Sequence, residues 1–227
     1  MKRLLDLVLA TAAVLLLSPV LLAIAVWIVC SDPGPVFYRG PRVGRSFRPF
    51  RIYKFRTMVV NADKVGGSST AGDDPRITAA GAFLRRYKLD ELPQLLNVIL
   101  GQMSLVGPRP QVAWAVELYQ PHERALLSVR PGMTDLASIR FRNEAEILRG
   151  AADPDKAYLE RIAPEKHRLG LEYVRRQSLA LDLRIMLATV TAILGGDPER
   201  LLSDVADHAP STQSPQTRTH ESIAEHS

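Results

Sequence analysis

The sequence predicts a mainly α-helical protein with short irregular or β pieces. A re-entrant membrane segment of the helix-break-helix kind comes first, and a small cytosolic α-rich domain with interfacial helices follows. Three features predict this class: an uncharged apolar run near the N-terminus, segments of helical periodicity after residue 79, and proline and glycine clusters between them. The chain of 227 residues is long enough for one domain with a buried core plus appendages.

The first element is an apolar helix. Residues 7–30 carry no charge, and a helix of that length extends about 36 Å, enough for a bilayer core of about 30 Å. Ser18 and Pro19 stand in its middle, where proline removes a backbone donor and a serine hydroxyl can bond a carbonyl one turn earlier. The sequence therefore predicts a bend at this point.

Positive charge flanks the apolar run on both sides. Lys2 and Arg3 precede it and an arginine-rich stretch follows it, whereas a simple span shows this bias on its cytoplasmic side only. We expect both ends on one face, so that residues 1–31 form a re-entrant hairpin; an ordinary kinked span is the alternative. The single cysteine, Cys30, excludes a disulfide within the chain and fits a reducing cytoplasm.

A basic stretch follows the breaker cluster at residues 32–35. It contains no acidic residue, and its cations are Arg39, Arg42, Arg45, Arg48, Arg51, Lys54 and Arg56. Such a patch attracts phosphates of nucleic acid, nucleotide or lipid headgroups. Interleaved aromatic residues suit a membrane interface or single-stranded nucleic acid.

The remaining elements are predicted from periodicity and from breakers. Extended pieces are expected at 36–38 and 50–55, rigid turns at 106–110 and 131–132, and helices at 79–87, 90–100, 112–127, 144–150, 155–161 and 164–195. Beyond residue 195 the composition turns polar, which predicts a disordered tail over 196–227. The expected domains are thus 1–31, 32–195 and 196–227.

The segment KLDELPQ, residues 88–94, places Asp90 beside Glu91 directly after a cluster of basic residues. One interpretation is structural: Asp90 caps a helix N-terminus and Glu91 is a solvated first-turn acid. The other is functional: a carboxylate among cations can stay ionised, hold a hard cation such as Mg²⁺ and attack phosphorus. Spacing alone leaves both open.

The segment GPRP places Arg109 between Pro108 and Pro110. Two prolines restrict the backbone on either side of the arginine, as is useful when a guanidinium must meet a phosphate or a base at a set position. A structural turn with a surface arginine is the alternative.

Several of these motifs together resemble one family. The sequence is similar to the bacterial sugar transferases, the monotopic polyprenyl-phosphate phosphoglycosyl transferases, over residues 1–194. The likeness rests on KRLLD at 2–6, KFRTM at 54–58, DPRIT at 74–78, FLRRYKLDELPQLLNVILGQMSLVGPRP at 83–110 and RPGMT at 130–134.

The resemblance implies an enzyme that moves a sugar-1-phosphate from a UDP-sugar to undecaprenyl phosphate and releases UMP. This would be the initiating step of exopolysaccharide, capsule or O-antigen-type glycan synthesis, at the cytoplasmic face of the bacterial cytoplasmic (inner) membrane. The expected partners are the donor, the acceptor and the membrane, with a homodimer possible and no nucleic acid.

The resemblance also implies roles for single residues. Asp90 would be the nucleophile that forms a phosphosugar-aspartate, Glu91 its partner acid, and both would hold Mg²⁺. Substrate contacts are expected from Arg85, Lys54 and Arg56, and from Arg109 with its neighbours Pro108 and Pro110, while Ser18 and Pro19 would form the re-entrant break.

Two positions depart from the family pattern: Gln102 stands where an aspartate is usual, and Asp135 where glycine is frequent. Two rival hypotheses also remain. A non-catalytic, membrane-tethered adaptor could bind nucleic acid or anionic lipid through the basic stretch, and Asp90 could merely hold Mg²⁺ in a direct ternary-complex transfer.

Overall fold

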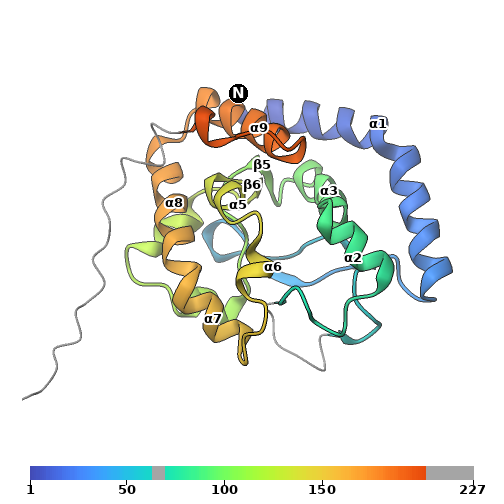
Figure 1. Ribbon diagram of the computed structural model, residues 1–227. Helices are drawn as coiled ribbons and strands as arrows, with labels where there is room; N and C mark the ends of the chain where they lie inside the picture. Colours follow the sequence, from blue (N-terminus) through green and yellow to red (C-terminus); the bar gives the residue numbers. More distant parts are fainter. Residues whose placement is uncertain (63–69, 203–227) are drawn as a thin grey trace, which may run out of the picture.

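The computed structural model describes residues 1–62 and 70–202, so most of the predicted tail lies outside the described residues (Figure 1). The mainly helical class is confirmed. The helices are α1 (Lys2–Ser31), α2 (Ala79–Arg86), α3 (Gln94–Ile99), α4 (Ala113–Glu117), α5 (Leu136–Arg140), α6 (Glu144–Ile147), α7 (Pro154–Arg161), α8 (Ala163–Arg176) and α9 (Leu179–Ile193). Short strands are β1 (Phe37–Tyr38), β2 (Pro41–Val43), β3 (Pro49–Arg51), β4 (Lys54–Phe55), β5 (Ser104–Val106) and β6 (Gly132–Thr134), and 3₁₀ turns are η1 (Arg45–Phe47), η3 (Leu89–Glu91), η4 (Glu123–Ser128) and η5 (Glu199–Leu201).

Helix α1 is continuous through Pro19, so the prediction of two helices separated by a break is wrong in that detail. The helix bends instead: Figure 1 shows it running along the top of the molecule and then turning down one side. Proline within a helix causes such bends. The Ser18 hydroxyl donates to the Leu15 carbonyl at 2.8 Å, as the sequence predicts.

The first turns of α1 are tied to the globular part of the chain by polar contacts. Lys2 Nζ donates to the Val106 carbonyl at 3.1 Å and lies 2.6 Å from Asp182 Oδ2. Asp6 is buried, and its carboxylate accepts from the Ser104 hydroxyl at 2.8 Å and from the Leu105 N–H at 3.1 Å. These bonds hold the N-terminus of α1 against β5.

The last turns of α1 return to the same globular part. Ile24 and Ile28 are buried against Phe55 and Leu84, and Asp32 at the helix end pairs with Arg56. Both ends of one helix therefore contact one packed body, and the side chains of Leu15 and Leu16 near its bend are exposed.

The basic stretch forms a long irregular hairpin. Strand β1 pairs antiparallel with β4, and β2 pairs antiparallel with β3. The Ile52 N–H donates to the Gly40 carbonyl at 3.0 Å and joins the two ladders. The two predicted extended pieces are confirmed, and they face each other.

Three predicted helices differ from the structure. The helix expected over 112–127 is two short pieces, α4 and η4, because Pro121 interrupts it. The helix expected over 164–195 divides into α8 and α9, since the Ser178 side chain accepts from the Leu181 N–H and begins a new helix. The helix expected over 90–100 begins only at Gln94.

A parallel strand pair is the part of the fold that periodicity did not reveal. Strands β5 and β6 pair over three residues each, at the edges of the segments 106–110 and 131–132 that were predicted as turns. Beyond the ladder, the Gly132 N–H donates to the Pro108 carbonyl at 3.0 Å, and a Cβ on Gly132 would lie 2.1 Å from the Gly107 nitrogen. The two backbones therefore approach as closely as glycine allows.

The largest core cluster lies beneath this pair, between α5, α8 and α9, and includes Val106, Tyr173 and Ile185. The Tyr173 hydroxyl donates to Asp182 Oδ1 at 2.7 Å and so joins the carboxylate that also holds Lys2. Leu202 packs into the same cluster, so the first residues of the predicted tail belong to the core.

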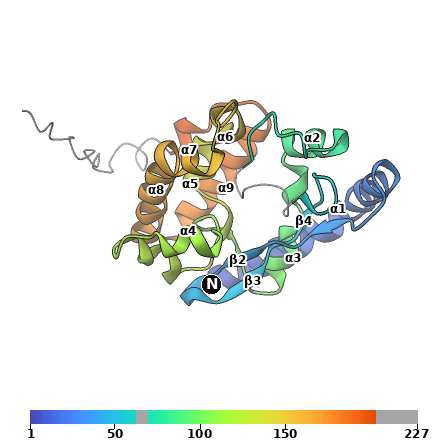
Figure 2. The ribbon, with the colours of Figure 1, turned by 90° about the horizontal axis from the view of Figure 1, so that it is seen from below.

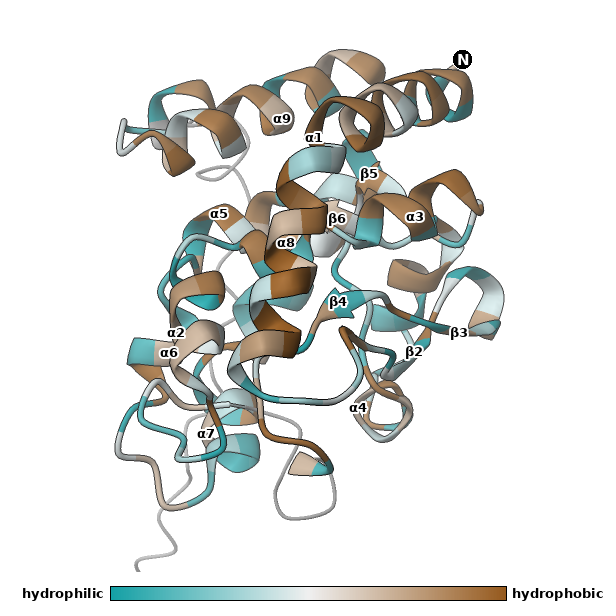
Figure 3. Cartoon of the chain, turned by 90° about the vertical axis from the view of Figure 1, so that its right-hand side faces the viewer, coloured by the Kyte–Doolittle hydropathy of each residue, from teal (hydrophilic) through white to brown (hydrophobic). Residues whose placement is uncertain are grey.

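An apolar surface covers one side of the molecule. Figure 3 shows α1 and α9 in one hydrophobic layer above β5, β6 and α3. The large exposed side chains at α1 and α9 include Leu4, Leu187, Val190, Ile193 and Leu194, and Leu100 is exposed at the end of α3. Among the described residues α1 is the one helix long and apolar enough to cross a membrane. Only 11% of its most apolar 18-residue stretch is buried.

The close approach of β5 and β6 yields a stability test. Gly132→Ala should lower the free energy of unfolding by about 3 kcal/mol because the added methyl group forces two backbones apart. Gly150→Ala is the control: its φ is +71° with no atom within 4 Å, so it should cost only about 1 kcal/mol of left-handed strain. Melting temperatures of the detergent-solubilised variants measure both; equal losses would contradict this packing argument.

Candidate active site

The two adjacent acids lie in η3, the 3₁₀ turn between α2 and α3. Lys88 adopts the left-handed conformation (φ 58°) and starts this turn, which buries Asp90 and leaves Glu91 half-buried. Asp90 is not the N-cap of a regular helix, since α3 begins four residues later with Pro93 as its N-cap. The structural interpretation of Asp90 is therefore wrong in this respect.

Glu91 binds two cations from distant parts of the sequence. Its Oε1 accepts from Lys54 Nζ of β4 at 3.0 Å and from the Arg109 guanidinium of the GPRP turn. Burial alone would raise the pKa of Glu91, but the charges of Arg109 and Lys54 outweigh burial and hold the pKa well below its ordinary range. Glu91 is thus a permanently ionised clamp between the hairpin and the turn.

Asp90 has the opposite environment. Its Oδ1 is buried and has no hydrogen-bond partner. Burial raises the pKa of Asp90, and the nearby charge of Glu91 adds to this; Lys54 most strongly, then Arg85 and Lys88, act in the other direction. The carboxylate is therefore poorly solvated but surrounded by positive charge, as suits an activated nucleophile.

A buried asparagine positions the lysine that faces both acids. Asn97 Oδ1 accepts from the Tyr53 N–H at 2.8 Å, and its Nδ2 donates to the Arg51 carbonyl at 2.9 Å and to Gln102 Oε1 at 2.7 Å. These bonds fix the hairpin on α3 just before Lys54. Gln102 therefore has a structural role, since it accepts one of these bonds from Asn97. That bond requires only an oxygen atom on the side chain at position 102.

Two hydrogen bonds besides the contact with Glu91 hold Arg109 in place. The Arg109 N–H donates to Asp135 Oδ2 at 3.2 Å, and its Nη1 donates to the Met133 carbonyl at 2.7 Å. Asp135 in turn caps α5 by accepting from the Ser138 N–H at 2.6 Å. The second departure from the family pattern is therefore a buried support of the arginine.

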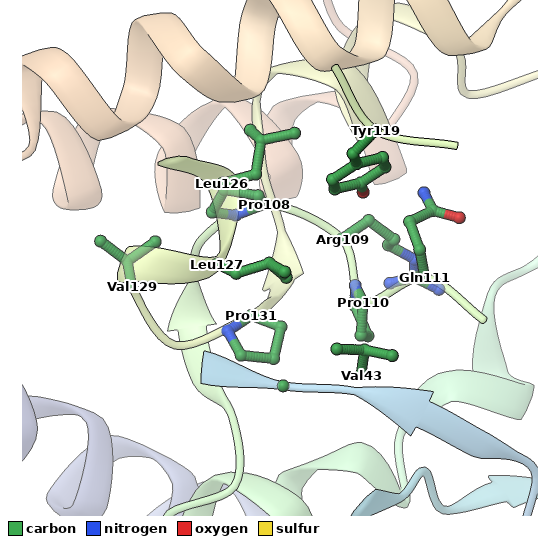
Figure 4. Close-up of a pocket in the computed structure, with 11 residues that line it drawn as sticks. Val43, Pro108, Arg109, Pro110, Gln111, Tyr119, Leu126, Leu127, Val129 and Pro131 are labelled. Atoms are coloured by element: carbon green, nitrogen blue, oxygen red, sulfur yellow. The ribbon is translucent and has the colours of Figure 1, made fainter. Parts of the chain in front are cut away.

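The back of the GPRP turn is closed by apolar side chains. Figure 4 shows Pro108 and Pro110 beside Leu126, Leu127 and Tyr119. The cavity between them measures about 10 Å³, which leaves room for at most one water molecule. The space behind the turn is therefore too small for a phosphate group.

Arg85 and Arg56, the other two predicted substrate contacts, lie in different surroundings. Arg85 lies half-buried in the last turn of α2, close enough for its charge to lower the pKa of Asp90. Arg56 is buried, and its guanidinium contacts Asp32 at the end of α1. Its polar contacts in the described chain anchor α1 rather than face the acids.

Sequence reasoning missed Gln94 and the support from Asp135. Gln94 is fully buried at the start of α3, four residues after Asp90, and neither polar atom of its side chain has a partner. A buried amide without partners is costly in a finished core and suits a site that receives a polar ligand. Its spacing from Asp90 was the available signal.

The acid pair could supply the one or two protein carboxylates that Mg²⁺ requires. No group of three or more acidic, histidine or cysteine side chains placed to hold a metal occurs in the described part of the chain. Magnesium needs only one or two carboxylates when substrate phosphates complete its coordination. Asp90 Oδ1 is free to be a ligand, whereas Glu91 Oε1 is already held by two cations.

A desolvated carboxylate surrounded by cations suits chemistry on phosphate, and the bent apolar helix beside it is consistent with a membrane anchor. Both features fit the class of membrane-associated enzymes that act on phosphates. Within that class the chain belongs to the bacterial sugar transferase family, whose model matches residues 1–196.

Named relatives agree with this family. The exopolysaccharide production protein ExoY of Sinorhizobium fredii is 39% identical over 207 residues, covering 85% of this chain and 84% of the relative. The UDP-glucose:undecaprenyl-phosphate glucose-1-phosphate transferase of Escherichia coli is 42% identical over 194 residues, covering 84% of this chain and 39% of the relative. An N-acetylgalactosaminephosphotransferase of Aeromonas hydrophila is 38% identical over 199 residues, covering 86% and 44%.

The chain is accordingly an enzyme of the sugar transferase class. The adaptor hypothesis receives no support from these relatives, because those named for an activity are transferases.

The contrasting environments of the two acids yield opposite effects on stability. The pKa of Asp90 is higher in the folded state than in the unfolded chain. Asp90 therefore lowers the free energy of unfolding once the pH rises above the pKa of Asp90 in the unfolded chain. Asp90→Asn should therefore raise the melting temperature near neutral pH, and the gain should vanish below about pH 4, where both states are protonated.

Glu91→Gln should do the reverse. The lowered pKa of Glu91 gives stability that is present above about pH 4.5 and is lost as pH falls through the folded value. Removing the clamp should cost about 3 kcal/mol near neutral pH. Thermal unfolding of both variants across pH measures this, and shifts of the same sign would contradict the assigned environments.

Proposed function

We propose that this enzyme transfers a sugar-1-phosphate from a UDP-sugar to undecaprenyl phosphate, with release of UMP, through a covalent phosphosugar-aspartate intermediate. The observation that carries the proposal is Asp90 Oδ1, a buried carboxylate oxygen without a partner, surrounded by the charges of Lys54, Arg85 and Lys88. A raised pKa makes the carboxylate more basic, and the surrounding cations act against that rise by favouring the ionised form.

The reaction requires two displacements at one phosphorus atom. Asp90 attacks the phosphorus next to the sugar, a bond from phosphorus to the carboxylate oxygen forms, and the bond to the bridging oxygen breaks. UMP leaves with that electron pair. A phosphate oxygen of the acceptor lipid then attacks the same phosphorus, and the carboxylate leaves as it was.

The other residues of the site orient substrates and stabilise charge. Arg109 is held by Glu91, Met133 and Asp135 and presents its remaining donors to the diphosphate at a set position. Arg85 meets phosphoryl oxygens from the α2 side. Mg²⁺, bound by Asp90 and the substrate phosphates, would supply neutralisation of the charge that develops on the leaving group.

The names of the relatives agree on undecaprenyl phosphate but differ in the sugar. Three relatives are named for glucose-1-phosphate and one for N-acetylgalactosamine phosphate, and all four names include undecaprenyl phosphate. Others are named for exopolysaccharide production. We accordingly assign a UDP-sugar donor, an undecaprenyl phosphate acceptor and the initiating step of exopolysaccharide, capsule or O-antigen-type synthesis.

A re-entrant anchor at the cytoplasmic face of the membrane is part of the proposal. Both ends of α1 bind the same globular body, through Lys2 and Asp6 at one end and Ile28 and Asp32 at the other, and a straight span would separate them. The bend at Pro19 and the exposed apolar side chains around it suit burial in one leaflet. The acceptor phosphate would lie at the same depth as the acids.

Donor alone should produce a burst. With a UDP-sugar that is a substrate, Mg²⁺ and no acceptor, the purified enzyme should release up to about one UMP per molecule, because Asp90 takes the phosphosugar and holds it. Asp90→Asn should release none and should lose turnover by about four orders of magnitude or more. Asp153→Asn, an exposed helix cap, is the control and should retain both.

The same experiment separates the covalent route from a direct ternary-complex transfer. A donor labelled in the sugar should leave its label on the wild-type protein after denaturation and none on Asp90→Asn. If no UMP appeared without acceptor while turnover with both substrates was normal, the direct route would be correct.

The topology has its own test. A cysteine tag placed before Lys2 and a second after Pro33, in a Cys30→Ser background, should both react with a membrane-impermeant maleimide only from the cytoplasmic side. Pro19→Leu removes the bend and should move the first tag to the opposite side or detach α1 from the globular body. Labelling of the wild-type N-terminus from outside would contradict the re-entrant anchor.

A further inference from the structure

A second basic site lies away from the acid pair. A cavity of about 220 Å³ opens between the first turn of α1, η1 at the end of the β2–β3 hairpin, and the segment that joins η4 to β6. The side chains that line it include Lys2, Arg3, Asp6, Arg45, Arg130 and Gln177. Figure 2, seen from below, shows the end of the β2–β3 hairpin in front of the N-terminus.

Only part of this positive charge is balanced within the protein. Lys2 pairs with Asp182, and the one acid of the lining, Asp6, is occupied by Ser104 and the Leu105 N–H. Neither Arg3, Arg45 nor Arg130 forms an ion pair with any residue in the described ranges 1–62 and 70–202.

Two of these arginines are held in place by backbone carbonyls. Arg3 donates to the Val98 carbonyl at 2.6 Å and the Ile99 carbonyl at 3.0 Å, and Arg130 Nε donates to the Gly101 carbonyl at 3.0 Å. Arg45 is exposed, and its guanidinium has no hydrogen bond to the described chain. Two oriented guanidinium groups and one free one, facing a single cavity, form a receptor for an oxyanion such as phosphate.

The surroundings of the cavity identify the source of the phosphate. Leu4 follows Arg3 and is 67% exposed, and Leu100, 61% exposed, precedes the glycine that receives the Arg130 bond. Leu4 is part of α1 in the hydrophobic layer of Figure 3, and Leu100 ends α3, which lies beneath that layer. An anion that reaches the cavity beside this layer would carry acyl chains along it.

The cavity is also separate from the transfer site. Arg3 binds carbonyls at the C-terminal end of α3, whereas Asp90 and Glu91 precede its N-terminal end. None of the acid pair, Lys54, Arg85 or Arg109 lines the cavity.

We propose that this cavity binds the phosphodiester headgroup of an anionic phospholipid, as a site distinct from the one that takes the acceptor. The lipid compensates Arg3, Arg45 and Arg130 and holds the N-terminal turn of α1 at headgroup depth. The site goes beyond the transfer reaction, because it uses none of the residues assigned to that reaction.

The test uses the full chain in a neutral detergent with dioctanoyl phosphatidylglycerol as the probe. Binding is followed as the rise of the melting temperature with lipid concentration. The wild-type protein should bind phosphatidylglycerol about tenfold more tightly than dioctanoyl phosphatidylcholine or inorganic phosphate. Arg45→Gln should weaken the binding about tenfold, since a charge-assisted hydrogen bond is lost.

Arg48→Gln is the matched control, because Arg48 is an exposed arginine of the same hairpin that does not line the cavity; it should bind the lipid like the wild type. Equal weakening in both variants would show diffuse attraction to charge and would overturn the site. Inorganic phosphate binding as tightly as the lipid would overturn the headgroup assignment. Asp90→Asn should bind phosphatidylglycerol normally, so a failure of the transfer chemistry would leave this result unchanged.

Discussion

The ion pairs of Glu91 are the interaction on which the site depends. They join three segments far apart in the sequence, the β4 strand through Lys54, the η3 turn, and the GPRP turn through Arg109. Each cation is itself fixed from behind, Lys54 by the Asn97 clamp on the hairpin and Arg109 by Asp135. A partly buried carboxylate with two such partners keeps its charge over the whole physiological range. Because Lys54 and Arg109 already pair with Glu91, Asp90 Oδ1 remains without a hydrogen-bond partner.

The pair thereby divides two tasks between adjacent residues. Glu91 stabilises the fold, and Asp90 is kept desolvated at some cost in stability, as is common where chemistry needs a reactive group. The buried amide of Gln94, also without partners, lies on the same short stretch of chain. The anchor follows a similar division. Polar residues at the two ends of α1, such as Lys2, Asp6 and Asp32, bind the globular body, whereas the exposed side chains around the bend are apolar.

The candidate site residues were easier to select from the sequence than the elements around them were to predict. The acid pair, Arg85, Lys54 and Arg109 could be chosen because unusual residue types recur in short motifs, and the structure brings all five together. The long helices expected over 112–127 and 164–195 failed at Pro121 and Ser178, where local capping and breaking override periodicity. Arg56 looked like the other cations of its stretch, but its partner, Asp32, is given only by the packing of α1. Strands β5 and β6 are three residues each and show no alternation that a pattern could detect.

By itself, the sequence determined the helical class, the apolar segment with its bend at Pro19, the basic hairpin and the motifs that mark the family, because each is encoded in consecutive residues. Only the tertiary structure decided that Glu91 is the clamp and Asp90 the free carboxylate, since adjacent acids are equivalent until distant cations select one of them. It also decided that Gln102 and Asp135 are supports, that both ends of α1 meet one body, and that Arg3, Arg45 and Arg130 share a cavity. Contacts across a hundred residues depend on packing, and packing is a property of the whole chain rather than of any segment.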